Sequence, residues 1–201
     1  MPEKPTLILA TRNAHKTEEI RQILGDRFCI TDVRSFPELP EIEETGTTFV
    51  ENARLKAMGI STRVPGWVLA DDSGLEVDAL GGAPGVWSSS FGGEEGNHAK
   101  NNVRLMQEMS GKDNRAARFR CTLVLAKDGE EIGVFCGTVE GTIATEAAGD
   151  GGFGYDPYFI PDGYEKSLSQ LGSAIKNSLS HRANALSELT EFLKHKNLEE
   201  F

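Results

Sequence analysis

Hydrophobic positions recur at two spacings along this chain, one helical and one typical of strands. Helical spacing marks four segments, and three of them begin at a residue whose side chain can cap a helix. The first predicted helix carries Ile20, Ile23 and Leu24 on one face, and the second runs from Thr48, which can form a capping box with Glu51, through about Ile60. The third follows Asn97, and its apolar positions are Val103, Met106 and Met109. The last follows Ser180, and its apolar positions are Ala183, Leu186, Leu189 and Leu193.

Strand-like runs lie between these helices, so the chain is predicted to form one mixed α/β domain. Residues 6–10 and 67–70 are short and apolar, which is typical of buried strands, and the second run is expected to end at the turn-forming residues 71–74. Residues 119–125 alternate as a half-buried strand does, and residues 127–130 predict a turn into a partner strand. The partner is expected over residues 132–139, and a further strand over residues 141–146.

The chain is acidic. Its 21 lysines and arginines against 31 aspartates and glutamates give 21 − 31 = −10, with histidine neutral. Because affinity for nucleic-acid polymers comes mainly from lysine and arginine neutralising phosphates, this charge argues against a nucleic-acid polymer as partner. The charge does not exclude a small phosphorylated ligand in a local basic pocket. A role in solubility alone would also account for the net negative charge.

Hydropathy and cysteine usage predict a cytoplasmic protein with no membrane partner. The first apolar run is too short for the core of a secretory signal, and no stretch approaches the ~18 apolar residues of a membrane span. The three cysteines are widely spaced, and two of them, Cys121 and Cys136, lie in strand-like segments. We therefore expect these two to be buried, reduced thiols.

Glycines crowd residues 148–157 and spell the GxGxxG pattern there. In dinucleotide-binding proteins a long helix must follow that pattern, and Pro157 and Pro161 forbid one here. We reject a Rossmann site on this ground, and the chain also lacks the GxxxxGK[ST] pattern of a P-loop. The segment predicts either a loop that approaches a ligand closely, with an aromatic stacking face on each side of Gly154, or a turn-rich loop without a ligand.

Three polar groups carry candidate chemistry, each with a structural alternative. Residues 11–16 precede a helix, where backbone N–H groups and Lys16 can hold an anion, or can simply form a capping loop. If the strand persists through Asp71 and Asp72, their side chains point to opposite faces and only one enters a given cleft. One or two carboxylates suffice to bind Mg²⁺ when phosphates and water complete its coordination, and the acidic residues 41–46 offer a second carboxylate. The structural alternatives are a turn at residues 71–74 and a solvated acidic loop at residues 41–46. Together these groups are typical of an enzyme acting on nucleotide phosphates.

Six ordered motifs resemble those of the Ham1 family, the inosine and xanthosine triphosphate pyrophosphatases, and most closely its bacterial members. They are residues 10–16, residues 43–46 with 49–53, residues 70–75, residues 80–86, residues 151–157, and Lys176 with residues 180–182. The resemblance implies one domain over residues 1–201, with a long mixed β-sheet flanked by helices, two lobes around a central cleft, and a homodimer. It also implies hydrolysis of the non-canonical purine triphosphates ITP, dITP and XTP to monophosphate and pyrophosphate with Mg²⁺, which cleanses the nucleotide pool.

The resemblance also implies roles for individual residues. Asp72 would be the general base and a metal ligand, and Glu43 the second metal carboxylate, with Glu44 as its alternative. The residues implied to touch the substrate are Thr11, Arg12, Asn13, Ala14, His15 and Lys16 at the triphosphate, then Ser73, and Phe153, Gly154, Tyr155, Asp156, Lys176, His181 and Arg182 at the base and sugar. Hydrogen-bond donors such as His181 and Arg182 suit the 6-oxo group of these purines and disfavour the 6-amino group of ATP.

The chain departs from the family pattern at three places, and other functions stay open. Arg12 stands where glycine is usual, residues 87–90 read Trp-Ser-Ser-Ser where Tyr-Ser-Ala-Arg is common, and Ile175 replaces an acidic residue. Trp87 and Phe91 form an apolar pair that either joins subunits or belongs to the core. The alternative functions are a Maf-like pyrophosphatase of other specificity, a phosphatase that releases single phosphates, and a non-catalytic nucleotide sensor.

Overall fold

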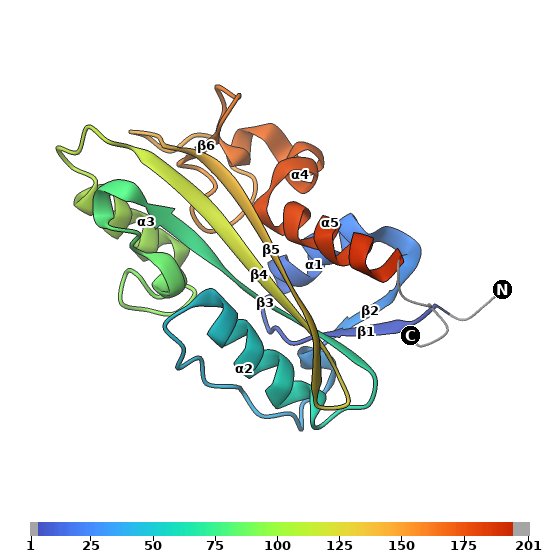
Figure 1. Cartoon of the computed structure of the whole chain (residues 1–201). Helices are drawn as coiled ribbons and strands as arrows, with labels where there is room; N and C mark the ends of the chain where they lie inside the picture. The colour runs from blue at the N-terminus through green and yellow to red at the C-terminus, as the bar shows by residue number, and fades with distance from the viewer. Residues whose placement is uncertain (1–3, 195–201) are drawn as a thin grey trace. The chain divides into compact units, whose positions relative to one another are not determined.

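The computed structural model describes residues 4–194, which contain five α-helices and six strands (Figure 1). In chain order these are β1 (Thr6–Leu9), α1 (Ala14–Leu24), β2 (Cys29–Asp32), α2 (Phe49–Ser61), β3 (Trp67–Val77), α3 (His98–Glu108), β4 (Ala116–Lys127), β5 (Glu130–Ile143), β6 (Phe159–Pro161), α4 (Leu168–Leu179) and α5 (His181–Lys194). Over this described range, no helix is both long enough and apolar enough to cross a membrane.

The six strands form one sheet in the order β2-β1-β3-β4-β5-β6. Strand β1 is parallel to β2 and to β3, with Leu7 opposite Trp67, whereas β5 and β6 are antiparallel. The neighbours β4 and β5 are joined by Asp128 and Gly129, which both have positive φ, as a tight hairpin turn requires. The sheet is therefore mixed, and the predicted fold class is confirmed.

The chain folds as two compact units. Unit 1 contains residues 4–72, 121–137 and 182–194, and unit 2 contains residues 73–120 and 138–181. Strands β3, β4 and β5 each contribute residues to both units. Each unit has its own apolar core and its own group of buried charged side chains.

Unit 1 buries apolar side chains on both faces of its strands. Because successive strand residues point to opposite faces, Trp67 and Leu69 pack with α1 and α5, whereas Val68 and Ala70 pack with α2. Figure 1 shows α2 on one side of these strands and α1 and α5 on the other. Burial on both faces explains why these strand segments are apolar without alternation.

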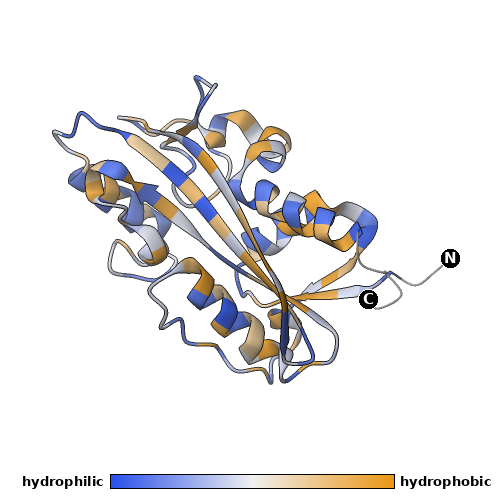
Figure 2. Cartoon of the chain, in the orientation of Figure 1, coloured by the Kyte–Doolittle hydropathy of each residue, from blue (hydrophilic) through white to orange (hydrophobic). Residues whose placement is uncertain are grey.

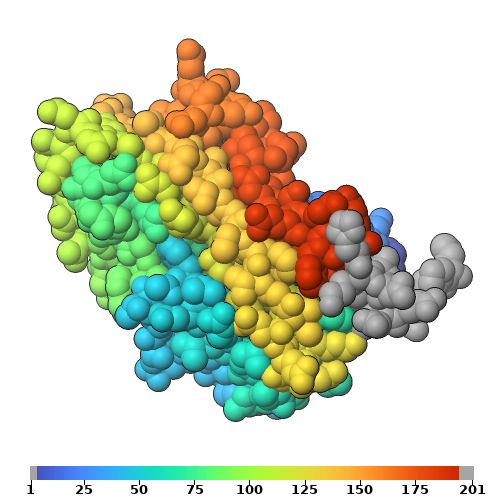
Figure 3. All heavy atoms as spheres, viewed as in Figure 1, coloured from blue at the N-terminus to red at the C-terminus, as the bar shows by residue number. Residues whose placement is uncertain are grey.

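Helix α5 packs against β5 within unit 1. The rings of Phe135 and Phe192 meet edge to face with their centroids 5.3 Å apart, and Figure 3 shows the red atoms of α5 beside the yellow atoms of β5. Leu186, Leu189 and Leu193 are buried, as their spacing predicted. Figure 2 shows apolar and hydrophilic residues together on α5 and on α2, which is typical of helices with one buried face.

Unit 2 has a separate core. It contains Leu105 of α3, Met109 directly after α3, Phe119 of β4, Phe159 of β6 and Leu168 of α4. The ring centroids of Phe119 and Phe159 lie 4.8 Å apart. This core supports the loop that contains the glycine cluster, because Tyr155 is one of its members.

The helix predictions with local capping signals are confirmed, whereas two strand boundaries are wrong. Strand β3 does not end at residues 71–74 but continues to Val77, because Leu75 and Val77 extend the buried face and both aspartates find cationic partners. Residues 141–143 are the end of β5 rather than a separate strand, and residues 144–146 are not in a strand.

Three side-chain placements also differ from expectation. Val103 is 57 % exposed, and Leu105 occupies the buried position of α3 instead. Cys136 is exposed, because its neighbour Phe135 takes the buried face of β5. Val124 is buried, so the middle of β4 is covered on both faces rather than half-buried. Cys121 is a buried thiol, as predicted.

Candidate active site

Asp71 and Asp72 are neighbours on β3 with different partners in unit 1. The carboxylate of Asp71 accepts hydrogen bonds from Lys16 Nζ at 2.6 Å and from Arg182 Nε at 2.8 Å, and so lies toward α1 and α5. Burial alone would raise the pKa of Asp71, but the charges of Arg182 and Lys16 hold that pKa well below its usual range. Asp71 is therefore a buried carboxylate engaged in ion pairs.

Asp72 points the other way, toward α2. Its Oδ1 accepts a hydrogen bond from Lys56 Nζ at 2.9 Å, and the carboxylate of Glu44 accepts one from the same ammonium at 2.8 Å. Burial raises the pKa of Asp72 to about 6, against the opposing charges of Lys56 and Lys16. A carboxyl group with a pKa so close to neutrality is suited to accept a proton from a reacting group.

The second carboxylate of this group is Glu44. Burial raises the pKa of Glu44, and the charge of Lys56 together with a hydrogen bond from Asp72 lowers it by more. Glu43 and Glu44 are both exposed, and of the two it is Glu44, not Glu43, that accepts a hydrogen bond from Lys56. Burial also lowers the pKa of Lys56, but the two carboxylates raise it by more, which keeps the ammonium charged.

These residues can hold a cation only in company with another ligand. The Oδ2 atom of Asp72 is buried and accepts no hydrogen bond from the described protein atoms, and Glu44 supplies a second acidic group beside it. Within residues 4–194, no three His, Cys, Asp or Glu side chains gather as they would in a site made by protein alone. This donor set fits Mg²⁺, which binds through one or two carboxylates with phosphates and water.

The loop of residues 11–16 is shaped by capping bonds. Asn13 Oδ1 accepts hydrogen bonds from the backbone N–H of His15 at 2.9 Å and of Lys16 at 3.3 Å. Thr11 Oγ1 accepts one from the backbone N–H of Asn13, and the Arg12 guanidinium donates to the carbonyl of Leu39 at 3.0 Å. The capping alternative is thus present, and Lys16 is the cation that the loop brings to Asp71.

Unit 2 holds a second group of predicted site residues. Lys176 Nζ donates to Asp156 Oδ2 at 2.6 Å, and both side chains are buried. The backbone N–H of Phe153 donates to the same oxygen at 2.9 Å, and the Lys176 ammonium lies 4.6 Å from the centre of the Phe153 ring. Gly152 has φ +76°, and a Cβ there would lie 2.2 Å from Asp156 Oδ2. Gly152, a member of this glycine-rich loop, therefore allows the loop to approach a buried ion pair closely.

The remaining predicted residues have more varied surroundings. His181 is buried in unit 2 and stacks on Phe119 with ring centroids 4.9 Å apart. Tyr155 is a core residue whose hydroxyl donates to the carbonyl of Ser88, whereas Phe153 is half-buried. Arg182 is fully buried in unit 1. Gly154 and Ser73 are also half-buried, and Ala14 is exposed at the start of α1.

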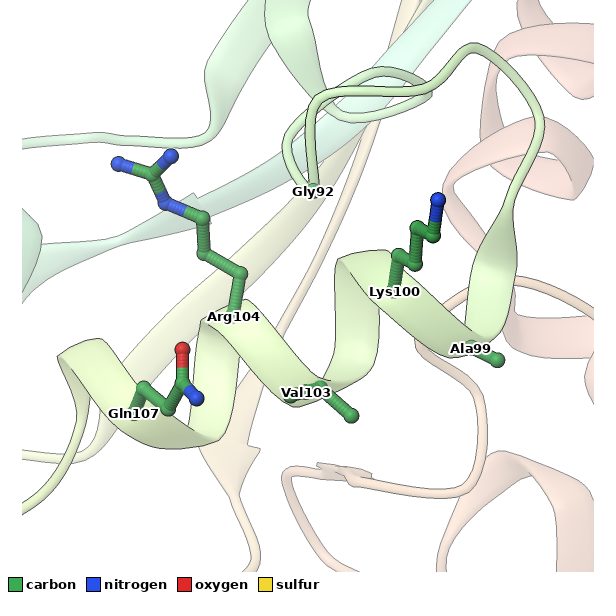
Figure 4. A pocket seen from close by; sticks show the side chains of 6 residues that line it. All are labelled: Gly92, Ala99, Lys100, Val103, Arg104 and Gln107. Atoms are coloured by element: carbon green, nitrogen blue, oxygen red, sulfur yellow. The ribbon is translucent and has the colours of Figure 1, made fainter.

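A surface hollow on α3 does not contain any of these residues. It measures about 320 Å³ and is lined by Gly92, Ala99, Lys100, Val103, Arg104 and Gln107 (Figure 4). Its two cations already have partners, because Lys100 pairs with Glu94, and Arg104 lies over the Phe91 ring. Phe91 also packs against the core of unit 2, whereas Trp87 is 61 % exposed, so the two do not form one apolar pair in the core.

Two members of the unit 1 group were missed by sequence reasoning. Lys56 lies three residues after Ala53 and four before Ile60, both buried positions of α2, and a lysine on the buried face of a helix is a signal that could have identified it. Glu19, on α1, pairs with the buried Arg182, and only the tertiary structure reveals that partner.

The fold and the two charged groups define an α/β protein with acid–lysine sites suited to an anionic ligand. A sequence model of the Ham1 family matches residues 7–192, and the chain belongs to this family. A protein of Listeria monocytogenes named dITP/XTP pyrophosphatase is 44% identical over 190 residues, covering 93% of this chain and 94% of the relative. A solved Ham1 protein of Staphylococcus aureus aligns with a TM-score of 0.85 at 35% identity, covering 96% of this chain and 100% of that one.

A Streptococcus pyogenes relative with the same name is longer. It is 46% identical over 190 residues, which cover 92% of this chain and 58% of the relative. The chain thus spans a little over half the length of that streptococcal protein.

Proposed function

We propose that this protein is a nucleoside triphosphate pyrophosphatase that hydrolyses ITP, dITP and XTP to the monophosphate and pyrophosphate. The observation that carries the proposal is Asp72, a buried carboxyl with a pKa of about 6 beside Glu44 and Lys56. Family membership and the names of the relatives support the same reaction.

In the proposed reaction, a water oxygen bonds to the α-phosphorus and the bond from that phosphorus to the pyrophosphate oxygen breaks. Asp72 takes the proton of the attacking water and later releases it to solvent. The ammonium groups of Lys56 and Lys16 offset the negative charge that would repel the nucleophile. Mg²⁺, when bound at Asp72 and Glu44, would neutralise further phosphate charge.

We assign the substrate contacts residue by residue. Residues 11–16 take the triphosphate, and Phe153, Asp156, Lys176 and His181 take the base and sugar. The 6-oxo group of these purines accepts hydrogen bonds, whereas the 6-amino group of ATP would face donors in a buried site. Such a hydrogen-bond mismatch can favour the 6-oxo purine triphosphates over ATP by ~10⁴-fold.

Incubation of the protein with a panel of nucleoside triphosphates and Mg²⁺ tests the proposal, with products resolved chromatographically. We expect monophosphate and pyrophosphate from ITP, dITP and XTP, and far slower turnover of ATP. Release of orthophosphate would indicate a phosphatase, and binding without turnover a nucleotide sensor. Preference for a pyrimidine or modified nucleotide would indicate a Maf-like specificity, and equal rates with ATP would overturn the proposed selectivity.

We further propose that the functional form is a homodimer. Sedimentation velocity measures this directly, and the mass of one chain is 21.9 kDa. A single species near that mass at micromolar concentration would contradict the dimer.

A further inference from the structure

Four charged side chains form a continuous ion-pair network inside unit 1. Lys16 pairs with Asp71 at 2.6 Å, Asp71 pairs with Arg182 at 2.8 Å, and Arg182 pairs with Glu19. The side chains of Asp71 and Arg182 are each 1% exposed, and that of Glu19 is 14% exposed. Two positive and two negative charges make the network neutral.

Asp71 is saturated by this network. Its Oδ1 accepts hydrogen bonds from Lys16 Nζ at 2.6 Å and from Arg182 Nη2 at 3.5 Å, and its Oδ2 accepts one from Arg182 Nε at 2.8 Å. The thiol of Cys121 donates to Oδ2 as well, at 3.3 Å. Both oxygens are therefore occupied, so Asp71 serves to hold Lys16.

Helix α1 supplies both ends of the network. Lys16 and Glu19 are three residues apart, which places them on the same side of the helix. Lys16 reaches Asp71 directly, and Glu19 reaches it through the guanidinium of Arg182. If Glu19 lost its charge, Arg182 would lose this ion pair, would draw more strongly on Asp71, and would compete with Lys16 for that carboxylate.

We propose that Glu19 is a positioning residue: through Arg182 and Asp71 it holds the ammonium of Lys16 where that group meets the substrate's phosphates. This inference rests on the proposed function only in taking Lys16 as a phosphate contact. In this proposal Glu19 itself contacts no substrate atom, and its effect on phosphate binding passes through Lys16.

A double-mutant cycle of Glu19→Gln and Lys16→Met tests the proposal. We expect Glu19→Gln alone to raise KM for ITP about tenfold, on the scale of coupling within a hydrogen-bonded network, with kcat changed less than about threefold. In the Lys16→Met background, the same substitution should change KM by less than about twofold. Equal fold-changes in the two backgrounds would overturn the proposal, because a purely structural role does not depend on Lys16.

The matched control is Glu18→Gln. Glu18 neighbours Glu19 on α1 and pairs with the exposed Arg21, so this variant changes the net charge equally and leaves the network intact. It should leave KM unchanged. Thermal unfolding of every variant identifies loss of fold, and Glu19→Asp, which keeps the charge but shortens the side chain, should raise KM severalfold if Glu19→Gln fails to fold. An unchanged KM for a folded Glu19→Asp would then overturn the proposal.

Calorimetry with inorganic tripolyphosphate measures binding in the same double-mutant cycle, without catalysis. We expect Glu19→Gln to weaken this binding about tenfold in the wild-type background and less than about twofold in the Lys16→Met background. If the wild-type protein binds tripolyphosphate with this pattern but hydrolyses no triphosphate, the proposed function fails and the inference stands. Hydrolysis without the coupling leaves the function intact and overturns the inference.

Discussion

Asp71 and Asp72 show how environment separates two identical side chains. Asp71 is paired with two cations and has a pKa well below its usual range, whereas burial raises the pKa of Asp72 to about 6. Adjacent strand positions produce this difference, because they direct one carboxyl toward Arg182 and the other toward Lys56. A carboxyl suited to accept a proton and a carboxylate held in ion pairs thus follow each other directly in the chain.

Substitution of Asp72 by asparagine should lower activity and raise stability. Loss of the base should reduce kcat by at least ~10²-fold. Because the pKa of Asp72 rises from 3.8 to about 6 on folding, its contribution to the free energy of unfolding is complete below pH 4 and is lost as the pH rises through 6. Asp72→Asn should therefore unfold at least about 2 °C higher than the wild type at pH 8, in EDTA, and gain nothing at pH 4.

Scanning calorimetry at the two pH values measures this stability change. An equal change of unfolding temperature at pH 4 and pH 8 would show that the stability gain does not come from the raised pKa of Asp72. Near-normal turnover of the variant would remove Asp72 from the mechanism.

Lys56 should set the pH at which Asp72 becomes a base. The Lys56 charge opposes the effect of burial on the pKa of Asp72, so Lys56→Met should raise that pKa further and move the acid limb of kcat/KM to higher pH by about one unit. This shift should lower activity about tenfold at pH 5, about twofold at pH 7, and hardly at all at pH 8.5. The measurement is kcat/KM for ITP between pH 5 and pH 9.

The control for this variant is Lys100→Met, which removes a surface lysine paired with Glu94. It should leave the profile unchanged, since exposed ion pairs are worth little. A uniform loss of activity in Lys56→Met, with no shift of the acid limb, would show that Lys56 acts by another route.

At the scale of elements, the helices with local capping signals were predictable from sequence. Thr48 and Glu51 form the capping box that their spacing predicted, and Asn97 caps α3. Such bonds join residues three apart, so a short stretch of sequence contains the information. Helix α4 was missed because it contains Gly172, with φ +78°, inside its span, which weakens the helical signal.

The elements and residues that sequence could not reveal depend on distant partners. Strand β2 is only four residues long, and its pairing with β1 is what makes it a strand. Strand β3 runs through two aspartates because lysines from two helices neutralise them. Lys56 and Glu19 were not predicted for the same reason, because their ion-pair partners are distant in the sequence and are known only from the packed structure. The prediction that Asp72 is the general base came from family resemblance rather than from periodicity.

The glycine loop of unit 2 offers a prediction at this scale. Gly152→Ala would place a Cβ 2.2 Å from Asp156 Oδ2 at φ +76°, so the loop must move away from the Lys176–Asp156 pair. We expect KM for ITP to rise about tenfold and stability to fall by about 2 kcal/mol, since strain and a broken buried ion pair combine. Steady-state kinetics and chemical denaturation measure the two effects.

Gly163→Ala is the matched control for this substitution. Gly163 has φ +82° and nothing within 4 Å of a Cβ, so it carries the backbone cost of about 1 kcal/mol without the collision. Its KM should equal that of the wild type. An equal rise of KM in both variants would mean that backbone strain, and not the contact with Asp156, disturbs the site.

At the scale of the whole molecule, a net charge of −10 has to be reconciled with the anionic substrate that we propose. Many basic side chains on the surface are matched by acidic ones, as in the pairs Arg54–Glu131, Lys100–Glu94, Arg118–Glu140 and Arg120–Glu76. Polymeric nucleic acid requires an extended basic surface, whereas a triphosphate requires only a few cations at one place. Lys16 and Lys56, both beside the aspartates of β3, meet the second requirement.

The protein should therefore discriminate between two polyanions by size. With Mg²⁺ at 150 mM salt, we expect inorganic tripolyphosphate to bind measurably, and a 20-base-pair duplex to bind more weakly than about 100 μM, beyond the range of ordinary non-specific binding. Calorimetry measures the first ligand and fluorescence anisotropy the second. Lys16→Met should weaken tripolyphosphate binding and leave the duplex unaffected, because only the small ligand uses that ammonium. Duplex binding tighter than about 10 μM would show instead that the acidic total conceals a basic surface large enough for a polymer, and the partner would then have to be reconsidered.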